Sequence, residues 1–467
     1  MMNQFYKIML VGFLGNLSWQ TFGQATELKV VPKDSNTVLQ AITKGKFYGQ
    51  ARLVSIFTDN QSGLSDYNAT ALGLGFGYRS DVYKGFQMEI GGFVTQNISS
   101  SDFTIADPVT KAIDRYEVGL YDLADVSRKN LLLRLQTLFL KYQFKKSSVL
   151  VGNYIPKNLF LNAQDGRMSP TIVQGIAFDL RPNKKIQVKL DWILGVSPRS
   201  TTHWYSVENS VGYYPLGVNV NGTKSQYFGN ITSAGIGILD IYYTPNPAVQ
   251  VLVGNILAEN MFNTAYLKTE FTHKIDNSHR LMIGALLVRQ NALENGGNAD
   301  PLKTYFPTQN QSLIINSRIG YSANSWETSL NFGRTTAEGR YLMPREWGVE
   351  QFYTFLPRER IEGVGDVWAY STKLSKTWFK KKLKSELGYG YYRFPDVKNV
   401  ALNKYGIPSF TQFTANVTFQ FSGKMKGLNA QMLFVRKDNR GEIYDNDRYV
   451  INKVNMSQLN FVLNYQL

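Results

Sequence analysis

The sequence predicts an all-β protein, a transmembrane antiparallel β-barrel of about eighteen strands. Three observations predict it. Strand-length segments alternate large apolar residues with small or polar ones, as strands do because successive side chains point to opposite faces. Short polar connections alternate with long ones along the chain. Beyond the N-terminal region, no run of 18 or more apolar residues is present to form a membrane-spanning helix.

The composition suits a wall with one face in lipid and the other in water. Charged residues are 18% of the 467 residues, against roughly 25% in a typical soluble domain. There is no cysteine, so the fold does not depend on disulfides. A net charge of +16 would suggest nucleic acid binding in a cytoplasmic protein, but an exported chain does not meet nucleic acid. We expect the charge to act on a pore wall, on anionic lipid or on acidic solutes.

The N-terminus has the order of a secretory signal. Lys7 is followed by an apolar run from Ile8 to Trp19, and the small residues Gly23 and Ala25 come next. We expect residues 1–25 to be a cleaved signal peptide, 26–44 a periplasmic lead-in and 45–467 the barrel. The expected location is the bacterial outer membrane.

The alternating segments predict the strands in order. They are 47–57, 68–79, 85–95, 131–144, 148–155, 173–181, 185–196, 233–244, 248–258, 263–274, 279–290, 311–321, 326–335, 366–378, 381–393, 410–421, 427–437 and 456–467. The turns between paired strands are rich in Asn, Pro, Gly and Lys. The long connections are about 58–67, 96–130, 156–172, 197–232, 259–262, 291–310, 336–365, 394–409 and 438–455. This alternation predicts short periplasmic turns and long extracellular loops.

The last segment, "SQLNFVLNYQL", predicts how the sheet closes. Leu459, Phe461, Leu463, Tyr465 and Leu467 share one face, and the other face is mostly amides. An even number of strands lets this strand pair with the first one, which removes the sheet edge that lipid could not satisfy. A barrel of this size is wide enough for an aqueous channel.

The segment "ALGLGFGY" has a bare face made of Ala71, Gly73, Gly75 and Gly77. Glycine weakens a strand by roughly 0.5–1 kcal/mol relative to alanine, so this stripe of small residues requires a structural explanation. Two interpretations remain open. The glycines either let the wall bend, or leave room for another segment, with the loop at 156–172 as the obvious candidate.

Two long connections carry a resemblance to a known family. "NAQDGRMSPTIVQG" at 162–175 and "REWGVEQFYTFLPRERIEG" at 345–363, on an eighteen-strand plan, resemble the OprD family of substrate-specific porins. The resemblance covers the chain from about residue 45 to the end. It implies a third loop, 156–172, folded into the lumen as a constriction with help from the seventh, and a ladder of basic residues that guides carboxylate-bearing solutes.

The candidate pore residues fall into two groups. In the loops, Asp165 and Arg167 flank a glycine and would place both charges in the constriction; the alternative is an ordinary solvated turn. The seventh loop adds Arg345, Glu346, Arg358 and Arg360 among aromatic residues, and such a loop packs either inside the mouth or on an outer partner. On the wall, the basic residues at lumen parity are Arg52, Arg134, Lys189, Arg280, Arg318, Lys373 and Lys384; the alternative for each is a charge at the rim.

We expect no enzyme activity. The three histidines, His203, His273 and His279, are not placed for a catalytic triad, and the glycines at 73–77 are not followed by a helix that could hold phosphate. No catalytic residue, cofactor or metal ligand is predicted.

The expected function is diffusion of small hydrophilic, preferentially anionic, solutes through a porin. The alternative is a plugged or accessory barrel within a larger outer-membrane assembly. Expected partners are these solutes, outer-membrane lipid and lipopolysaccharide, with no nucleic acid. A homotrimer or other outer-membrane proteins remain open as partners.

Overall fold

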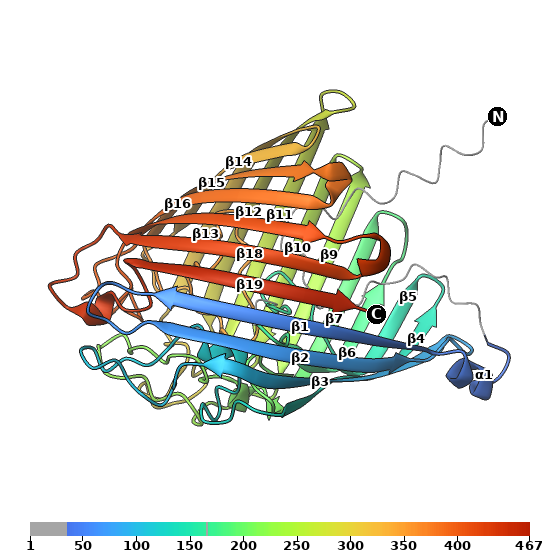
Figure 1. Cartoon of the computed structure of the whole chain (residues 1–467), viewed down its shortest axis with the longest axis horizontal. Coiled ribbons are helices and arrows are strands. Elements are labelled where there is room, and N and C mark those ends of the chain that lie inside the picture. The colour runs from blue at the N-terminus through green and yellow to red at the C-terminus, as the bar shows by residue number, and fades with distance from the viewer. Residues whose placement is uncertain (1–34, 165–166) are drawn as a thin grey trace.

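The computed structural model describes residues 35–164 and 167–467. The predicted signal peptide, most of the lead-in and Asp165 lie outside the described residues. The described chain is a closed antiparallel barrel of eighteen long strands, as the sequence predicts (Figure 1). None of its helices is long and apolar enough to cross a membrane.

The strands match the predicted segments closely. Their bounds are β1 Lys46–Asp59, β2 Tyr67–Arg79, β3 Phe86–Ser100, β4 Leu132–Phe144, β5 Ser147–Tyr154, β6 Ile172–Leu180, β7 Ile186–Ser197, β8 Tyr205–Ser206, β9 Ile236–Asn246, β10 Val249–Ala258, β11 Phe262–Lys274, β12 His279–Ala292, β13 Gln311–Ala323, β14 Trp326–Thr335, β15 Val367–Trp378, β16 Leu383–Arg393, β17 Phe410–Gln420, β18 Leu428–Asn439 and β19 Met456–Gln466. The sequence did not predict β8. It is a two-residue strand that pairs with the end of β7 inside a loop, while β7 pairs directly with β9 in the barrel.

Short helical segments lie between the strands. They are α1 Val38–Thr43 and the 3-10 turns η1 Val118–Leu120, η2 Glu208–Ser210, η3 Phe379–Lys381, η4 Gly423–Met425 and η5 Asp447–Tyr449. The side chain of Thr37 caps α1 by accepting a hydrogen bond from the backbone N–H of Gln40. This helix stands at the end of the barrel where β1 begins (Figure 1).

The last strand closes the sheet on the first. β19 pairs with β1 from Gln50↔Gln466 to Asp59↔Ser457. β1 is also paired with β2 on its other side, so β1 has no open edge. This confirms the predicted closure, and it satisfies the backbone groups that lipid could not.

The two ends of the barrel differ in their connections. Short turns lie at the end that carries the C-terminus and α1, and long loops gather at the opposite end (Figure 1). We number the long loops in chain order. Loop 2 is 101–131, loop 3 is 155–171, loop 4 is 198–235, loop 7 is 336–366 and loop 9 is 440–455.

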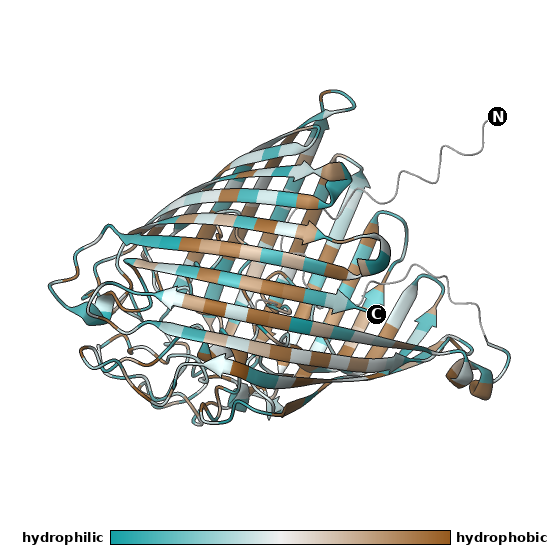
Figure 2. Cartoon of the chain, in the orientation of Figure 1, coloured by the Kyte–Doolittle hydropathy of each residue, from teal (hydrophilic) through white to brown (hydrophobic). Residues whose placement is uncertain are grey.

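The outside of the wall is apolar and the inside is largely polar. On β19, Leu459, Phe461 and Tyr465 are exposed, whereas Gln458 and Asn460 are buried. Figure 2 shows the same alternation along neighbouring strands. A water-soluble sandwich would bury the larger apolar face, so this inversion is typical of a transmembrane β-barrel.

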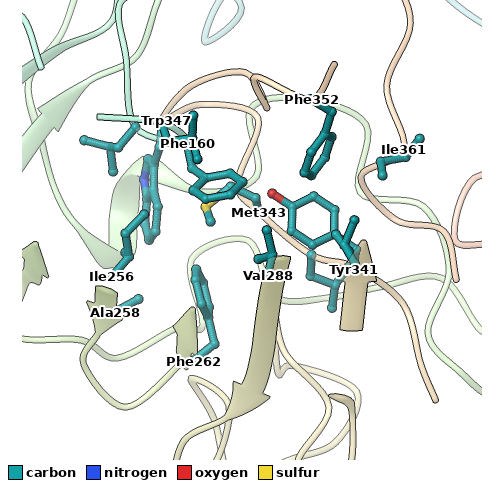
Figure 3. Packing of buried hydrophobic residues seen from close by; sticks show 14 of the residues in the cluster. Phe160, Ile256, Ala258, Phe262, Val288, Tyr341, Met343, Trp347, Phe352 and Ile361 are labelled. Carbon is teal, nitrogen blue, oxygen red and sulfur yellow. The ribbon is translucent and has the colours of Figure 1, made fainter. Parts of the chain in front are cut away.

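The main apolar core lies inside the loop end of the barrel. Phe160 of loop 3 and Trp347 of loop 7 are fully buried and pack with Phe262 of β11 and Tyr341 of loop 7 (Figure 3). The ring centroids of Phe262 and Trp347 are 6.0 Å apart. The inward fold of loop 3 is therefore confirmed, and loop 7 packs with it.

Candidate functional site

Loops 3 and 7 are joined to each other by backbone and side-chain hydrogen bonds. The N–H of Asn162 donates to the carbonyl of Trp347 at 3.2 Å, and its side-chain amide donates to the carbonyl of Val349 at 2.9 Å. At the other end of loop 3, the Thr171 hydroxyl donates to the carbonyl of Glu346 at 3.0 Å. The two loops thus form one unit inside the barrel.

Loop 3 is attached to the wall at both of its ends. Asn158 donates to the Asp240 carboxylate of β9 at 3.0 Å. Arg134 of β4 donates to the Ser169 hydroxyl at 2.6 Å and to the Pro170 carbonyl at 2.8 Å. The same guanidinium donates to the Ser197 hydroxyl on β7 at 3.0 Å. A predicted ladder residue, Arg134, therefore serves here as a clamp on loop 3.

Loop 7 is attached to other parts of the wall. The Tyr353 hydroxyl donates to Glu270 of β11 at 2.8 Å, and its backbone N–H donates to the Asn316 side chain of β13 at 2.6 Å. Further along the loop, Tyr392 of β16 donates to the carbonyl of Thr354 at 2.8 Å. These contacts hold loop 7 across the lumen.

Three arginines from different loops come together where these loops meet. Arg167 belongs to loop 3, Arg199 to loop 4 and Arg358 to loop 7. Burial, with the nearby guanidinium groups of Arg167 and Arg199, lowers the pKa of Arg358 to about 9. Burial likewise lowers the pKa of Arg199 to about 10, against an opposing effect of Tyr214. We call Arg167, Arg199 and Arg358 the arginine cluster.

The members of the arginine cluster differ in how well they are hydrogen-bonded. Arg358 Nε donates to Gln458 at 2.7 Å, and its Nη2 donates to Asn460, both on β19. Arg199 Nε donates to the Tyr214 hydroxyl at 2.9 Å. Arg167 is only 3% exposed, yet its Nε and Nη1 meet no acceptor in the described part of the chain.

The other predicted residues of loop 7 make contacts within loop 7 and with neighbouring loops. Arg345 Nε lies 2.6 Å from Glu362, and its guanidinium lies 4.1 Å from the centre of the Tyr405 ring. Burial acts to lower the pKa of Arg345, but Tyr405 and Glu362 outweigh burial and raise it. Glu346 accepts hydrogen bonds from the N–H groups of residues 212 and 214 at 2.8 and 3.2 Å. Arg360 donates to the Gly348 carbonyl at 2.7 Å.

The predicted basic residues of the wall lie on its inner face. Arg280 is exposed near the turn end of β12. It points to the same face of the strand as Gly284, where an added Cβ would meet the Tyr353 ring of loop 7. The others are buried or half-buried at lumen parity: Arg52, Arg134, Lys189, Arg318, Lys373 and Lys384. The structure does not gather them into one site but spreads them over β1, β4, β7, β13, β15 and β16.

Acidic partners on the inner wall were missed by the sequence reasoning. Arg318 lies 2.9 Å from Glu270, and Lys384 lies 2.8 Å from Glu386. Lys189 stands opposite Asp240 in the pairing of β7 with β9. The same period-two parity that placed the basic residues also places these acids inside. The wall is therefore interleaved in charge, and the arginine cluster lies in the loops instead.

Loop 2 carries a buried pair of carboxyl groups beside this region. Asp114 and Glu117 are 5% and 0% exposed, and burial raises the pKa of both. The Thr58 hydroxyl donates to one Glu117 oxygen at 2.5 Å, and the N–H of Val118 donates to one Asp114 oxygen at 2.6 Å. The charge of Asp114 adds to the effect of burial on the pKa of Glu117, and the second oxygen of each carboxyl group meets no donor in the described part of the chain.

The fold and the inward loops define the class: a transmembrane β-barrel of eighteen strands whose lumen is narrowed by loops 3 and 7. No family model matches the chain, and no curated protein matches it. Solved structures do match. Pseudomonas aeruginosa OccK9 (OpdG) has a TM-score of 0.72 at 14% identity, covering 91% of this chain and 99% of that chain.

Two further solved structures have a similar fold. Acinetobacter baumannii OccAB2 has a TM-score of 0.70 at 13% identity, covering 92% of this chain and 99% of that chain. Pseudomonas aeruginosa OpdK, solved with vanillate, has a TM-score of 0.65 at 13% identity, covering 91% and 99%. These matches confirm the OprD-type fold that the sequence resemblance implies.

Proposed function

We propose that the chain is an outer-membrane porin that passes small hydrophilic solutes and favours those with a carboxylate. The observation that carries the proposal is the arginine cluster, three guanidinium groups from loops 3, 4 and 7. Arg199 of loop 4 donates hydrogen bonds to Thr171 and Gln164 of loop 3, and Arg358 of loop 7 lies near Arg167 and Arg199. Guanidinium is planar, keeps its charge and binds carboxylate through paired hydrogen bonds. Repulsion between the three cations is relieved when an anion enters between them.

Arg167 is the residue on which recognition rests. Its Nε and Nη1 are buried donors with no acceptor among the described residues, and an unpaired buried donor costs about 1–3 kcal/mol. A solute carboxylate supplies the missing acceptor. Arg199 and Arg358 already donate to Tyr214 and Gln458, so they contribute mainly charge. The OpdK structure solved with vanillate, a carboxylate, supports this class of solute for a barrel of the same fold.

The basic residues of the wall then interact with the solute along its path through the lumen, whereas the arginine cluster selects it. Arg318 and Lys384 are balanced by Glu270 and Glu386. Each pair therefore attracts an anion only locally, and the wall does not carry a uniformly positive potential. Binding must be weak enough at each step to let the solute leave. We therefore place selectivity at the arginine cluster and transit along the interleaved wall.

Single-channel recording in planar bilayers tests the proposal. The purified barrel should give ohmic steps, and vanillate should interrupt the current more than vanillyl alcohol, which lacks the carboxylate. Arg167→Gln should abolish the difference between these two probes. Arg440→Gln, an exposed arginine of loop 9, serves as the matched control and should leave it unchanged. Equal interruption by both probes in the parent protein would contradict carboxylate selection.

The alternative is a plugged barrel that serves an outer-membrane assembly. The apolar core of Phe160, Trp347, Phe262 and Tyr341 favours it, because this core fills part of the loop end. The same recording separates the two functions. A barrel that inserts and folds but carries no current supports the accessory role.

A further inference from the structure

The turn end of the barrel is lined with exposed lysines. They are Lys44, Lys46, Lys84, Lys145, Lys146, Lys184, Lys185, Lys274, Lys380, Lys381, Lys382, Lys424 and Lys426. Within the short turns of the described chain, Asp276 is the exposed acid, and it lies 2.7 Å from His279. The end of the barrel therefore carries a strongly positive rim that the solute route does not explain.

Aromatic rings on the outer wall show where this rim lies relative to the membrane. Trp326 and Trp378 have ring centroids 6.3 Å apart at the turn end of β14 and β15, and Phe86 and Tyr142 have centroids 4.7 Å apart on β3 and β4. All four are exposed on the outside. Aromatic girdles of this kind sit at the membrane–water interface. The lysines of the turns lie just beyond the girdle, at the level of the lipid headgroups.

The lysines are densest next to the two tryptophans. Lys376 lies on the outer face of β15, opposite Trp326 in the pairing with β14. Its ammonium lies 4.1 Å from the centre of the Trp326 ring and 3.6 Å from that of Trp378. A lysine on a lipid-facing wall extends its ammonium toward the headgroups while its methylenes stay in the apolar layer. Lys376 thus makes the positively charged surface continuous from the aromatic girdle of the outer wall to the lysines of the turns.

The neighbouring turn continues this surface. Phe379 is 70% exposed and is followed by Lys380, Lys381 and Lys382. Lys382 donates to Ser422 of the next turn at 2.8 Å, which brings the two turns side by side. That next turn repeats the pattern, with Met425 54% exposed between two lysines. Exposed apolar side chains between cations match a surface that meets both acyl chains and anionic headgroups.

We propose that this surface binds the anionic headgroups of phospholipids in the periplasm-facing leaflet. We call it the lysine patch, made of Lys376, Lys380, Lys381, Lys382, Lys424 and Lys426. The ammonium groups recognise the phosphodiester charge, and Trp326, Trp378 and Phe379 hold the lipid's glycerol and upper acyl region. The proposal requires only that the barrel spans the membrane, so it stands whether or not the channel selects carboxylates.

Lipid-specific fluorescence quenching tests it on the full barrel. The protein is placed in vesicles of phosphatidylcholine and phosphatidylglycerol in which one species carries brominated acyl chains that quench tryptophan. The parent should prefer phosphatidylglycerol, since one lysine near a surface favours anionic lipid by about fivefold. The variant K376Q/K380Q/K381Q/K382Q should lose most of the preference.

The matched control neutralises four lysines at the same end but away from the patch, K145Q/K146Q/K184Q/K185Q, and should keep the preference. No preference in the parent, an unchanged preference in the patch variant, or an equal loss in the control would each overturn the proposal. If the patch variant does not fold, a salt titration of the parent decides. A preference that persists at about 1 M salt, where the Debye length is about 3 Å, would contradict headgroup electrostatics.

Discussion

The side chain of Met168 occupies the space that a side chain on Gly73 would need. A Cβ at position 73 would stand 2.8 Å from the terminal methyl carbon of Met168 and closer still to the Phe93 ring. Met168 belongs to loop 3, so the bare stripe of β2 gives clearance to the loop that enters the lumen. At Gly77 the occupant is instead the ring of Tyr48, from the neighbouring strand β1. The stripe therefore accommodates both loop 3 and the inward rings of adjacent strands.

Replacing Gly73 with leucine should move loop 3. Overpacking at a tight site costs about 1–3 kcal/mol, and both the Phe93 ring and the Met168 side chain of loop 3 must shift to make room. We expect a folded barrel whose conductance falls or becomes noisy in single-channel recordings. Gly75→Leu is the control, because a Cβ there would meet Gln50 and Phe93 rather than loop 3. Identical recordings from the Gly73 variant and the parent would contradict clearance for loop 3.

Removing the Arg134 clamp should loosen loop 3. Hydrogen bonds from a charged donor are worth about 1.5–3 kcal/mol, and Arg134 makes several to residues 169, 170 and 197. We expect Arg134→Ala to lower the unfolding temperature and to broaden the distribution of conductance levels. Arg280→Ala, at an exposed lumenal position, should change neither the stability nor the width of the distribution. Unaltered conductance levels in the Arg134 variant would show that the clamp is not needed.

Loop 2 should open as pH rises, because of Asp114 and Glu117. Burial raises the pKa of both carboxyl groups in the folded protein, so the folded state holds a proton that the unfolded state releases. This stability is present below the ordinary carboxyl pKa values of 3.8 and 4.5 and is lost as pH rises through the raised ones. Trypsin cleavage after Lys111 should therefore increase with pH beyond the protease's own pH dependence.

Glu117→Gln supplies the comparison for loop 2, since the amide resembles the protonated acid. The ratio of parent to variant cleavage should rise with pH. Glu294→Gln, an exposed carboxyl in another loop, should follow the parent at every pH. A constant ratio between the Glu117 variant and the parent would exclude the carboxyl pair as the cause.

External protease should distinguish the loops on intact cells. Loop 2 exposes Lys111, Ile105 and Val109, whereas most of loop 7 between residues 339 and 348 is buried in the lumen. The sequence predicts that both loops are extracellular, and of these two the structure favours loop 2 for early cleavage. Mass spectrometry of the released peptides checks the order. Cleavage that appears only after the outer membrane is breached would reverse the assigned topology.

The barrel could be predicted from the sequence because the alternation of side chains along each strand is a local pattern. Leu459, Phe461 and Tyr465 on one face of β19, with amides on the other, predicted both the strand and its lipid-facing side. The same reasoning assigned lumen parity to Arg318 and Lys384. Glu270 and Glu386 share this parity, but strand parity alone does not show which charges pair with one another.

The sequence by itself determined the eighteen strands, their closure and the two faces of the wall, because side-chain alternation is fixed within each strand. Only the tertiary structure decided which charges meet. Arg167, Arg199 and Arg358 lie in three loops without periodicity. They come together because Thr171 of loop 3 hydrogen-bonds to loops 4 and 7, while Asn158 and Tyr353 attach loops 3 and 7 to the wall. Such contacts join residues far apart in the chain, and no local pattern encodes them.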